Sequence, residues 1–328
     1  MYDAVITFPA LGEGFVFNPQ RYIDLFGFKI YWYGLIIAVG FILAALYIGK
    51  RCRAYGLTGD DVMNMLLCSV PAGIVGARLY YIVFFLDNFK ADTVGQFLKN
   101  CISLRNGGLA IYGGVIFGVI GLILYAHAKK IKTGAVLDLA AHGVIIGQIF
   151  GRWGNFINRE AYGVSAGIDT FFLRMGLTTP DGVTTYVHPT FLYESVWNLI
   201  GFLILHFVSK KRKFDGQIFA MYVAWYGLGR FFIEGLRADS LYLFHTGLRV
   251  SQGLAALSFL AAAMYLILRL GDKAGLDPSR MYVNTEASRE RMKKADKELR
   301  GEDISPEAPA ENTEDKQTEQ DQNDKEEQ

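Results

Sequence analysis

The 328-residue chain is too apolar for an ordinary soluble domain of its size, because 52% of its residues are hydrophobic and 14% are aromatic. Its net charge is only +1, yet residues 301–328 hold eleven acidic residues and two lysines, which leaves +10 on the first 300 residues. The cysteines, Cys52, Cys68 and Cys101, are odd in number and lack CxxC spacing, which argues against a disulfide framework and a zinc site. This composition favours a membrane protein with a basic body and an acidic end.

The first 30 residues precede the first long apolar segment. They lack the charged stretch, apolar run and small-residue cleavage site of a signal peptide, so we expect no removable leader. We expect residues 1–30 to form an N-terminal segment on the outer face of the membrane.

Seven segments are long and apolar enough to cross a bilayer core of about 30 Å as helices. They are, approximately, residues 31–49, 62–86, 108–128, 134–157, 190–208, 215–235 and 249–269. Basic clusters follow the first, third and fifth segments at Lys50–Arg53, Lys129–Lys132 and Lys210–Lys213, and Arg269 and Lys273 follow the seventh. Because basic loops stay in the cytoplasm, the sequence predicts an all-α, polytopic membrane bundle of seven transmembrane helices with its N-terminus outside and its C-terminus cytoplasmic.

Beyond Gly271 the apolar pattern ends, so the transmembrane domain is expected at residues 31–270 and a tail at 271–328. From about residue 284 the tail contains almost no large apolar side chain. Such a composition cannot offset the entropy of ordering the chain, and we expect a disordered, acidic, cytoplasmic tail with little functional content.

Two of the predicted spans carry glycines at four-residue spacing: Gly114 and Gly118 in one, and Gly143, Gly147 and Gly151 in the other. In a membrane this spacing lets helix backbones approach closely. We interpret these glycines as packing positions.

The sequence GRWGNFINREAYG at 151–163 places unusual polarity at the outer end of the fourth span. If the helix persists, Arg152, Asn155 and Arg159 share one face, with Glu160 slightly off it. A single arginine at a helix end is explained by snorkelling to the interface. Several charged and amide groups together are costly there, and such groups usually face the interior of a bundle, where they find partners.

The sixth span ends in a similar way, with YGLGRFFIEGLRAD. Arg230, Glu234 and Arg237 follow one another at helical spacing and share a face, and the second span adds Arg78 in GARLYY. Clustered arginines indicate an anion, since a guanidinium binds phosphate or carboxylate through paired hydrogen bonds. The anion available at this depth is a phospholipid headgroup. An internal Arg–Glu network that holds helices together is the alternative for Arg230 and Glu234.

Three further motifs open spans on the same face: YWYG at 31–34, NGGLAIYGG at 106–114 and HPTFLYE at 188–194. Within them, His188 is a candidate proton carrier or a hydrogen-bonding anchor, and Tyr33 is either a site residue or part of an interfacial aromatic belt.

Taken together, these motifs closely resemble those of the bacterial prolipoprotein diacylglyceryl transferase family. The resemblance is specific because many polar positions of GRWGNFINREAYG agree within thirteen residues. It extends through YWYG, GARLYY, GGLAIYGG, HPTFLYES and GRFFIEGLR. Residues 1–20 and 271–328 lie outside it.

The resemblance implies an enzyme of the bacterial inner membrane whose active site lies towards the outer face. Such an enzyme takes the diacylglyceryl group from phosphatidylglycerol and attaches it to the lipobox cysteine thiol in the signal peptide of a preprolipoprotein. A thioether forms and glycerol phosphate leaves. The expected partners are therefore phosphatidylglycerol, preprolipoprotein signal peptides and the lipid bilayer, with no cofactor, no metal and no nucleic acid.

The roles that the resemblance implies, together with the polar motifs predicted at the outer face, give two sets of candidate residues. The candidates for catalysis are Arg152, Glu160, Arg230, Glu234 and Tyr112. The candidates for substrate binding are Tyr33, Arg78, Asn155, Asn158, Gly163, His188 and Arg237. The arginines at 152 and 230 are assigned to the phosphate, the glutamates to orienting them or to accepting the thiol proton, and the asparagines to the headgroup.

One position departs from the family pattern. Many members have a histidine, proposed as a base, where this chain has Tyr112. A tyrosine with an ordinary pKa near 10 needs strong help from neighbouring arginines to act as a base. A hydrogen-bonding role for Tyr112 is the alternative.

Two other classes of function compete with this interpretation. A transporter of a small anion usually places its charges near the middle of the membrane and often shows a repeat between its halves, whereas here the charges gather at one face and no repeat is evident. A lipid-binding scaffold without catalytic activity would not need glutamates beside arginines in two helices.

Overall fold

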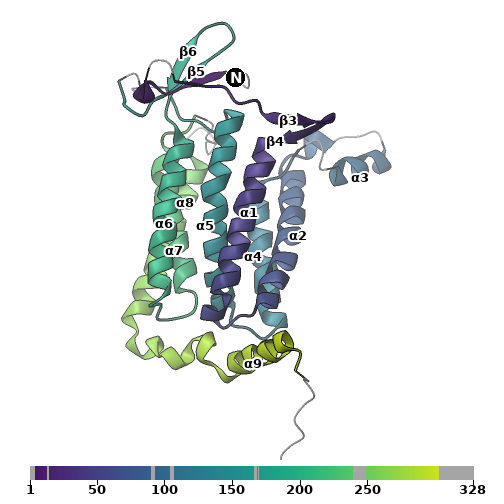
Figure 1. Cartoon of the computed structure of the whole chain (residues 1–328), viewed down its shortest axis with the longest axis vertical. Helices are drawn as coiled ribbons and strands as arrows, with labels where there is room; N and C mark the ends of the chain where they lie inside the picture. Colours follow the sequence, from purple (N-terminus) through teal and green to yellow (C-terminus); the bar gives the residue numbers. More distant parts are fainter. Residues whose placement is uncertain are drawn as a thin grey trace, which may run out of the picture.

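The computed structural model describes residues 4–12, 15–89, 93–103, 107–165, 168, 170–238 and 249–302. Seven long helices stand side by side in a bundle (Figure 1). They are α1 (Trp32–Arg51), α2 (Gly59–Phe84), α4 (Ile111–Ala128), α5 (Thr133–Asn158), α6 (Thr190–Ser209), α7 (Gln217–Glu234) and α8 (Val250–Gly271). Each of these helices coincides, to within a few residues at either end, with one of the seven predicted apolar segments.

Within the described residues, six of these helices are long and apolar enough to cross a membrane; the six do not include α7. The α7 helix has 18 residues and carries Arg230 and Glu234 within them. Large apolar side chains such as Leu46, Leu67 and Leu257 point outward from the bundle and are exposed. The protein is therefore mostly helical, with an apolar outer surface that suits a bilayer.

The bundle has two distinct ends (Figure 1). We call the end at which α5 finishes with Asn158 and α7 finishes with Glu234 the site end, and the opposite end, where α1 finishes with Arg51, the tail end. The closest helix pairs are α2 with α4, α1 with α5, and α7 with α8, and α5 also contacts α6 and α7. The central position of α5 places its C-terminal motif between several neighbouring helices.

Short strands cover the site end, which corrects the expectation of an all-α chain. Strands β1 (Val5–Thr7), β2 (Val16–Phe17), β5 (Met175–Thr178) and β6 (Thr184–Val187) form an antiparallel sheet in the order β2-β1-β5-β6, and β3 (Tyr22–Leu25) and β4 (Phe28–Tyr31) form a hairpin. Buried Ile6 and Leu177 pack over Phe156 and Phe191, whose rings stack 4.3 Å apart. Strands of two to four residues show too little alternation to be recognised in the sequence. A short helix, α3 (Val94–Ile102), and 3₁₀ turns at Pro9–Leu11 and Leu86–Phe89 complete this end.

The glycines predicted to mediate packing do so unevenly. The α2 and α4 backbones are in close contact, since a Cβ at Gly114 would lie 3.5 Å from the carbonyl oxygen of Gly73. By contrast, a Cβ at Gly147 or Gly151 would meet nothing within 4 Å. These two glycines of α5 leave open space beside the helix.

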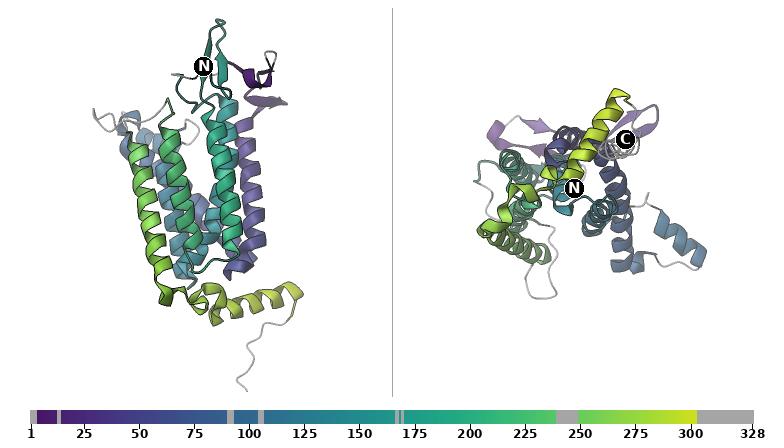
Figure 2. Two further views of the ribbon diagram at one scale, coloured as in Figure 1. Left: turned by 90° about the vertical axis from the view of Figure 1, so that its left-hand side faces the viewer. Right: turned by 90° about the horizontal axis from the view of Figure 1, so that it is seen from below.

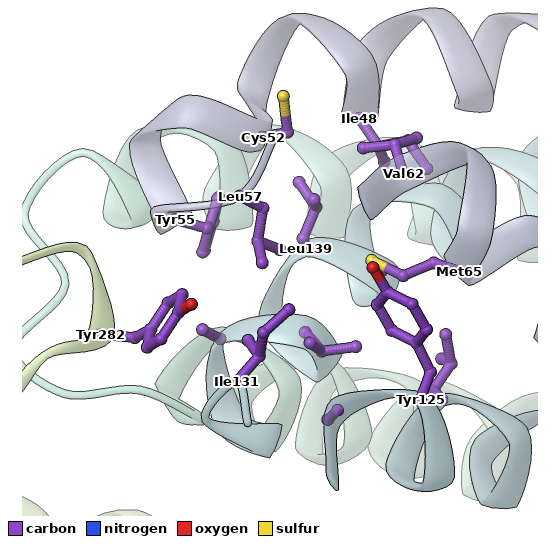
Figure 3. Packing of buried hydrophobic residues seen from close by; sticks show 14 residues of the cluster. Ile48, Cys52, Tyr55, Leu57, Val62, Met65, Tyr125, Ile131, Leu139 and Tyr282 are labelled. Atoms are coloured by element: carbon purple, nitrogen blue, oxygen red, sulfur yellow. The ribbon is translucent and has the colours of Figure 1, made fainter. Parts of the chain in front are cut away.

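Residues 272–302 differ from the expected disordered tail, because they fold across the tail end (Figure 2). Three 3₁₀ turns (Lys273–Leu276, Pro278–Arg280 and Tyr282–Asn284) lead into α9 (Glu286–Arg300). The side chain of Tyr282, 2% exposed, joins the apolar cluster of the tail end with Tyr55, Leu57 and Ile131 (Figure 3). Its backbone N–H donates to the carboxylate of Asp215 at 2.6 Å. Residues 303–328 of the predicted tail lie outside the described residues.

A buried carboxylate at the start of α2 ties α9 to the bundle. Asp61 is 2% exposed and forms a capping box with Thr58. It also accepts a hydrogen bond from the Tyr125 hydroxyl at 2.6 Å, and it forms an ion pair with Arg291 of α9. Because a carboxylate without partners is costly in a buried position, the Arg291 contact stabilises the docked helix.

We predict that Arg291→Ala lowers the free energy of unfolding by about 1–3 kcal/mol, because Asp61 loses a charged hydrogen-bond donor. The measurement is the thermal unfolding midpoint of the purified protein in detergent. Arg300→Ala, in the same helix but exposed, is the control and should leave the midpoint nearly unchanged. Equal midpoints for Arg291→Ala and the wild type would contradict the role of this contact.

Candidate functional site

Three elements meet at the site end around one carboxylate. Glu194 lies in the second turn of α6, and only 5% of its side chain is exposed. Arg152, from the last two turns of α5, forms an ion pair with it, with Nη2 2.7 Å from Oε2. Arg230 from α7 and Arg237 just beyond α7 both approach Oε1, at 3.2 and 3.5 Å. Three guanidinium groups, one from α5 and two from α7 and the residues just beyond it, thus share the Glu194 carboxylate.

A second carboxylate orients Arg230 from within its own helix. Glu234 lies one turn after Arg230, forms an ion pair with it, and is 1% exposed. Arg249, at the start of α8, donates a hydrogen bond to the backbone carbonyl of Glu234. The predicted arrangement of Arg230 and Glu234 on one face of α7 is therefore seen, with Glu194 on the neighbouring helix completing it.

The signature motif forms a hydrogen-bonded chain that starts at Arg152. Its Nη1 donates to Oδ1 of Asn155 at 3.3 Å, and Nδ2 of Asn155 donates to Oε1 of Glu160 at 2.9 Å. Nδ2 of Asn158 donates to the same Glu160 oxygen at 3.3 Å. The four polar side chains therefore form one network, in which Glu160 is bound by neutral amides.

Arg159 does not join this network, because α5 ends before it. The helix finishes at Asn158, and Arg159 takes a left-handed conformation with φ 52°. Its side chain donates to the backbone carbonyls of Ala4 and Pro19 at 3.0 and 2.9 Å and to Oδ1 of Asn18 at 3.0 Å. The expected shared face of Arg152 and Arg159 is thus replaced by an anchor for the N-terminal segment.

Gly163 lies where three segments cross. Its N–H donates to the carbonyl of His188 at 2.9 Å, and it forms an isolated β-bridge with Arg237. A Cβ at this position would lie 2.6 Å from the Cβ of His188 and 2.8 Å from the carbonyl oxygen of Leu236. The absence of a side chain at Gly163 lets the signature, the start of α6 and the end of α7 approach one another.

His188 has contacts that fit an anchor. Its Nδ1 lies 3.2 Å from the hydroxyl of Tyr193, and its ring packs beside Phe171. Burial lowers the pKa of His188 below its usual value, so the ring is neutral at pH 7.

Arg78 is placed away from the carboxylate cluster, as a clamp on the backbone that joins α2 to α4. All five guanidinium N–H donors are used, on the carbonyls of Asn100, Cys101, Ser103, Gly107 and Gly108 at 2.7–2.9 Å. The structure therefore gives Arg78 a role in holding this connection, and the expected convergence of its guanidinium with the other arginines is not seen.

The two candidate tyrosines occupy different surroundings. The Tyr112 hydroxyl forms a hydrogen bond with the Ser251 hydroxyl of α8 at 3.0 Å, and its ring lies 6.4 Å from that of Tyr80. The Tyr33 ring packs at the position that a Cβ of Gly154 would occupy, and it interacts electrostatically with Glu160 and Arg152. Of the two, Tyr33 lies beside the signature network.

The cluster has the properties of an anion site. Arg152 and Arg230 keep 19% and 16% of their side chains exposed, whereas the carboxylate between them is almost fully covered. Both guanidinium groups are therefore held in place from one side and accessible from the other. Within the described residues, no group of three or more His, Cys, Asp or Glu side chains could hold a metal ion.

Comparison with known proteins shows the family of the chain. Residues 20–268 match the family model described as prolipoprotein diacylglyceryl transferase. The chain belongs to this family. It is 42% identical over 275 residues to a phosphatidylglycerol--prolipoprotein diacylglyceryl transferase of Enterococcus faecalis, covering 82% of this chain and 95% of that protein. Proteins of the same name are 40% identical in Clostridium botulinum (72% of this chain, 91% of that protein) and in Streptococcus uberis (75% and 93%).

Sequence reasoning missed the residue at the centre of the Arg–Glu cluster, Glu194. Glu194 lies in HPTFLYE, a motif from which only His188 is predicted as a site residue. The signal was available, because an ionisable residue near a membrane-spanning segment is costly without a partner. The same argument singled out Glu234.

We predict that Gly163→Ala displaces the segments that cross there, because the new methyl group would overlap two backbone-fixed neighbours. The expected results are a loss of about 1–3 kcal/mol in the free energy of unfolding and a clear loss of activity. Gly95→Ala, where a Cβ meets nothing within 4 Å, is the control. A Gly163→Ala protein with wild-type stability and activity would show that the close approach is dispensable.

Proposed function

We propose that this chain transfers the diacylglyceryl group of phosphatidylglycerol to the lipobox cysteine thiol of preprolipoproteins, in the bacterial cytoplasmic membrane. The observation that carries the proposal is the meeting of Arg152 and Arg230 at Glu194, beside the signature network. Membership of the family and the names of the relatives support the choice of both substrates.

We place the site end on the extracytoplasmic side, with all seven long helices crossing the membrane, the N-terminus outside and the C-terminus in the cytoplasm. The support is the distribution of basic residues: Lys50–Arg53, Lys129–Lys132 and Lys210–Lys213 all lie at or just beyond the tail-end termini of helices. The charges of α7 do not oppose this placement, because Arg230 and Glu234 are paired and only 16% and 2% of their side chains are exposed.

In the proposed reaction, the thiol sulfur attacks the glyceryl carbon that carries the phosphate. The new bond is a carbon–sulfur thioether, the carbon–oxygen bond to the phosphate breaks, and glycerol phosphate leaves with the bonding electron pair. Arg152 and Arg230 bind the phosphate oxygens and stabilise the negative charge that grows on them as the bond breaks. Glu194 and Glu234 hold these two guanidinium groups in position before the substrate arrives.

The thiol proton needs an acceptor, since an ordinary cysteine has a pKa near 8.5 and reacts as the thiolate. We assign this role to Glu160. Its hydrogen bonds come from the amides of Asn155 and Asn158 rather than from a guanidinium, so its charge is not neutralised by a salt bridge in the network. The Asn155 amide couples Glu160 to Arg152, which keeps the proton acceptor beside the phosphate site.

The alternative of an anion transporter has less support. Its binding site would be expected near the middle of the helices, whereas the Arg–Glu cluster lies where α6 begins and α7 ends. The family match also points to a transferase.

We predict that Arg152→Ala and Arg230→Ala each lower transfer by about 100-fold or more, since each removes a donor to the departing phosphate. The assay incubates purified protein with phosphatidylglycerol and a lipobox peptide and measures the mass of the thioether adduct. Arg53→Ala, which removes an exposed ion pair with Asp296 at the tail end, is the control and should retain full activity. Normal transfer by either site variant would refute the phosphate role of that arginine.

We also predict that Tyr112→Phe retains near-normal transfer between pH 6 and 9, because the hydroxyl that it loses is bonded to Ser251 and Glu160 accepts the proton. The measurement is the rate of adduct formation across this pH range. A large loss that changes with pH would instead identify the Tyr112 hydroxyl as the proton carrier.

A further inference from the structure

A reciprocal pair of tryptophans joins α6 to α7. The rings of Trp197 and Trp225 are stacked, with centroids 4.3 Å apart and planes 17° from parallel. The indole N–H of Trp197 donates to the backbone carbonyl of Trp225 at 3.0 Å, and the indole N–H of Trp225 donates to the backbone carbonyl of Trp197 at 3.0 Å. Each tryptophan is therefore both donor and acceptor for the other.

Two glycines make this pairing possible. Gly201 follows Trp197 by four residues in α6, and Gly229 follows Trp225 by four residues in α7. A Cβ at either glycine would overlap the indole of the opposite helix. A helical Cβ tilts towards the N-terminus and covers the preceding turn, so each glycine uncovers the carbonyl four residues earlier. That carbonyl has a second lone pair for the indole N–H.

The pairing is sensitive to the axial register of the two helices. Both acceptors are backbone carbonyls, which cannot rotate to follow a displaced donor. A slide of α7 along α6 by one residue, about 1.5 Å, would lengthen both hydrogen bonds together. Trp153 gives a contrast, because its indole N–H donates to the Ser195 hydroxyl at 3.0 Å, and that hydroxyl can turn to follow it.

The tryptophan pair lies next to the Arg–Glu cluster. Glu194 precedes Trp197 by three residues in α6, and Arg230 directly follows Gly229, on which the Trp197 ring packs. We propose that Trp197 and Trp225 are positioning residues that set the register of α6 against α7 and so hold Arg230 at its 3.2 Å distance from Glu194. The proposal deepens the proposed function and rests on it, since the distance matters through the phosphate that the arginines bind.

The test is a double-mutant cycle on the transfer assay. Trp225→Phe keeps a ring and removes the N–H donor, and we expect transfer to fall by about 10-fold or more, because a misplacement of 1 Å can cost about 100-fold. In the Glu194→Gln background the ion pair between Arg230 and Glu194 is already lost, so Trp225→Phe should change transfer by less than about threefold. The methyl group of Gly201→Ala would overlap the Trp225 indole and displace it, so this variant should reproduce the effect of Trp225→Phe.

Two controls separate positioning from general packing. Trp153→Phe loses an indole hydrogen bond between α5 and α6 and should show the same fold-loss in both backgrounds. Gly49→Ala adds a methyl group to a helix where nothing lies within 4 Å, and it should leave transfer unchanged. An equal loss from Trp225→Phe in the wild-type and Glu194→Gln backgrounds would overturn the proposal. The tryptophan pair would then stabilise the bundle without acting through the ion pair between Arg230 and Glu194.

The outcome for the proposed function is read separately, from the wild-type protein alone. If the wild type forms no thioether adduct, the proposed function fails. The same cycle is then run on thermal unfolding midpoints, where coupling between Trp225→Phe and Glu194→Gln supports the register role and additive midpoint shifts overturn it.

Discussion

The rest of the site end depends on one covered carboxylate, Glu194, which three guanidinium groups share. Glu234 pairs with Arg230 as well, and Arg152 and Arg230 keep part of their side chains exposed, which suits these two arginines to the phosphate role proposed above. Holding cations this close costs free energy in a poorly solvated site. The other contacts that fix each arginine offset this cost. In the proposed reaction, a site built in this way holds its arginines in place before the phosphate arrives.

This constraint explains why segments from distant parts of the sequence cross at the site end. Arg152 is fixed by its own signature through Asn155, and Arg230 is fixed by Glu234 in its own helix. Arg237 lies beyond the end of α7, and its backbone pairs with Gly163. The strands above the cluster rest on Phe156, in the last turn of α5, so the sheet and the helix ends form one packed unit.

Two kinds of feature could be predicted from the sequence: those with a regular residue spacing, and ionisable residues whose burial in a membrane costs free energy. The apolar segments, and the shared face of Arg230 and Glu234, follow from length and helical spacing alone. The short strands could not be predicted, because β1 pairs with β5, which lies about half of the chain away in the sequence. The folding of residues 286–300 was missed for a related reason: α9 is polar by composition, and it is held by contacts such as Arg291 with Asp61 that no local pattern contains. Arg78 was misinterpreted because five backbone carbonyls bind a guanidinium as well as a phosphate does.

The contrast between Arg78 and Arg152 shows what separates a structural arginine from one in a binding site. Arg78 spends all five donors on carbonyls whose positions it fixes, so a ligand would have to displace protein. Among the described residues, Arg152 forms a hydrogen bond with Asn155 through Nη1 and an ion pair with Glu194 through Nη2. Its side chain remains partly exposed. Donor satisfaction and exposure, rather than the presence of arginine at a helix end, therefore distinguish the candidate anion site from a structural arginine. Neither property can be read from one sequence, because both depend on which backbone carbonyls the folded chain brings within reach.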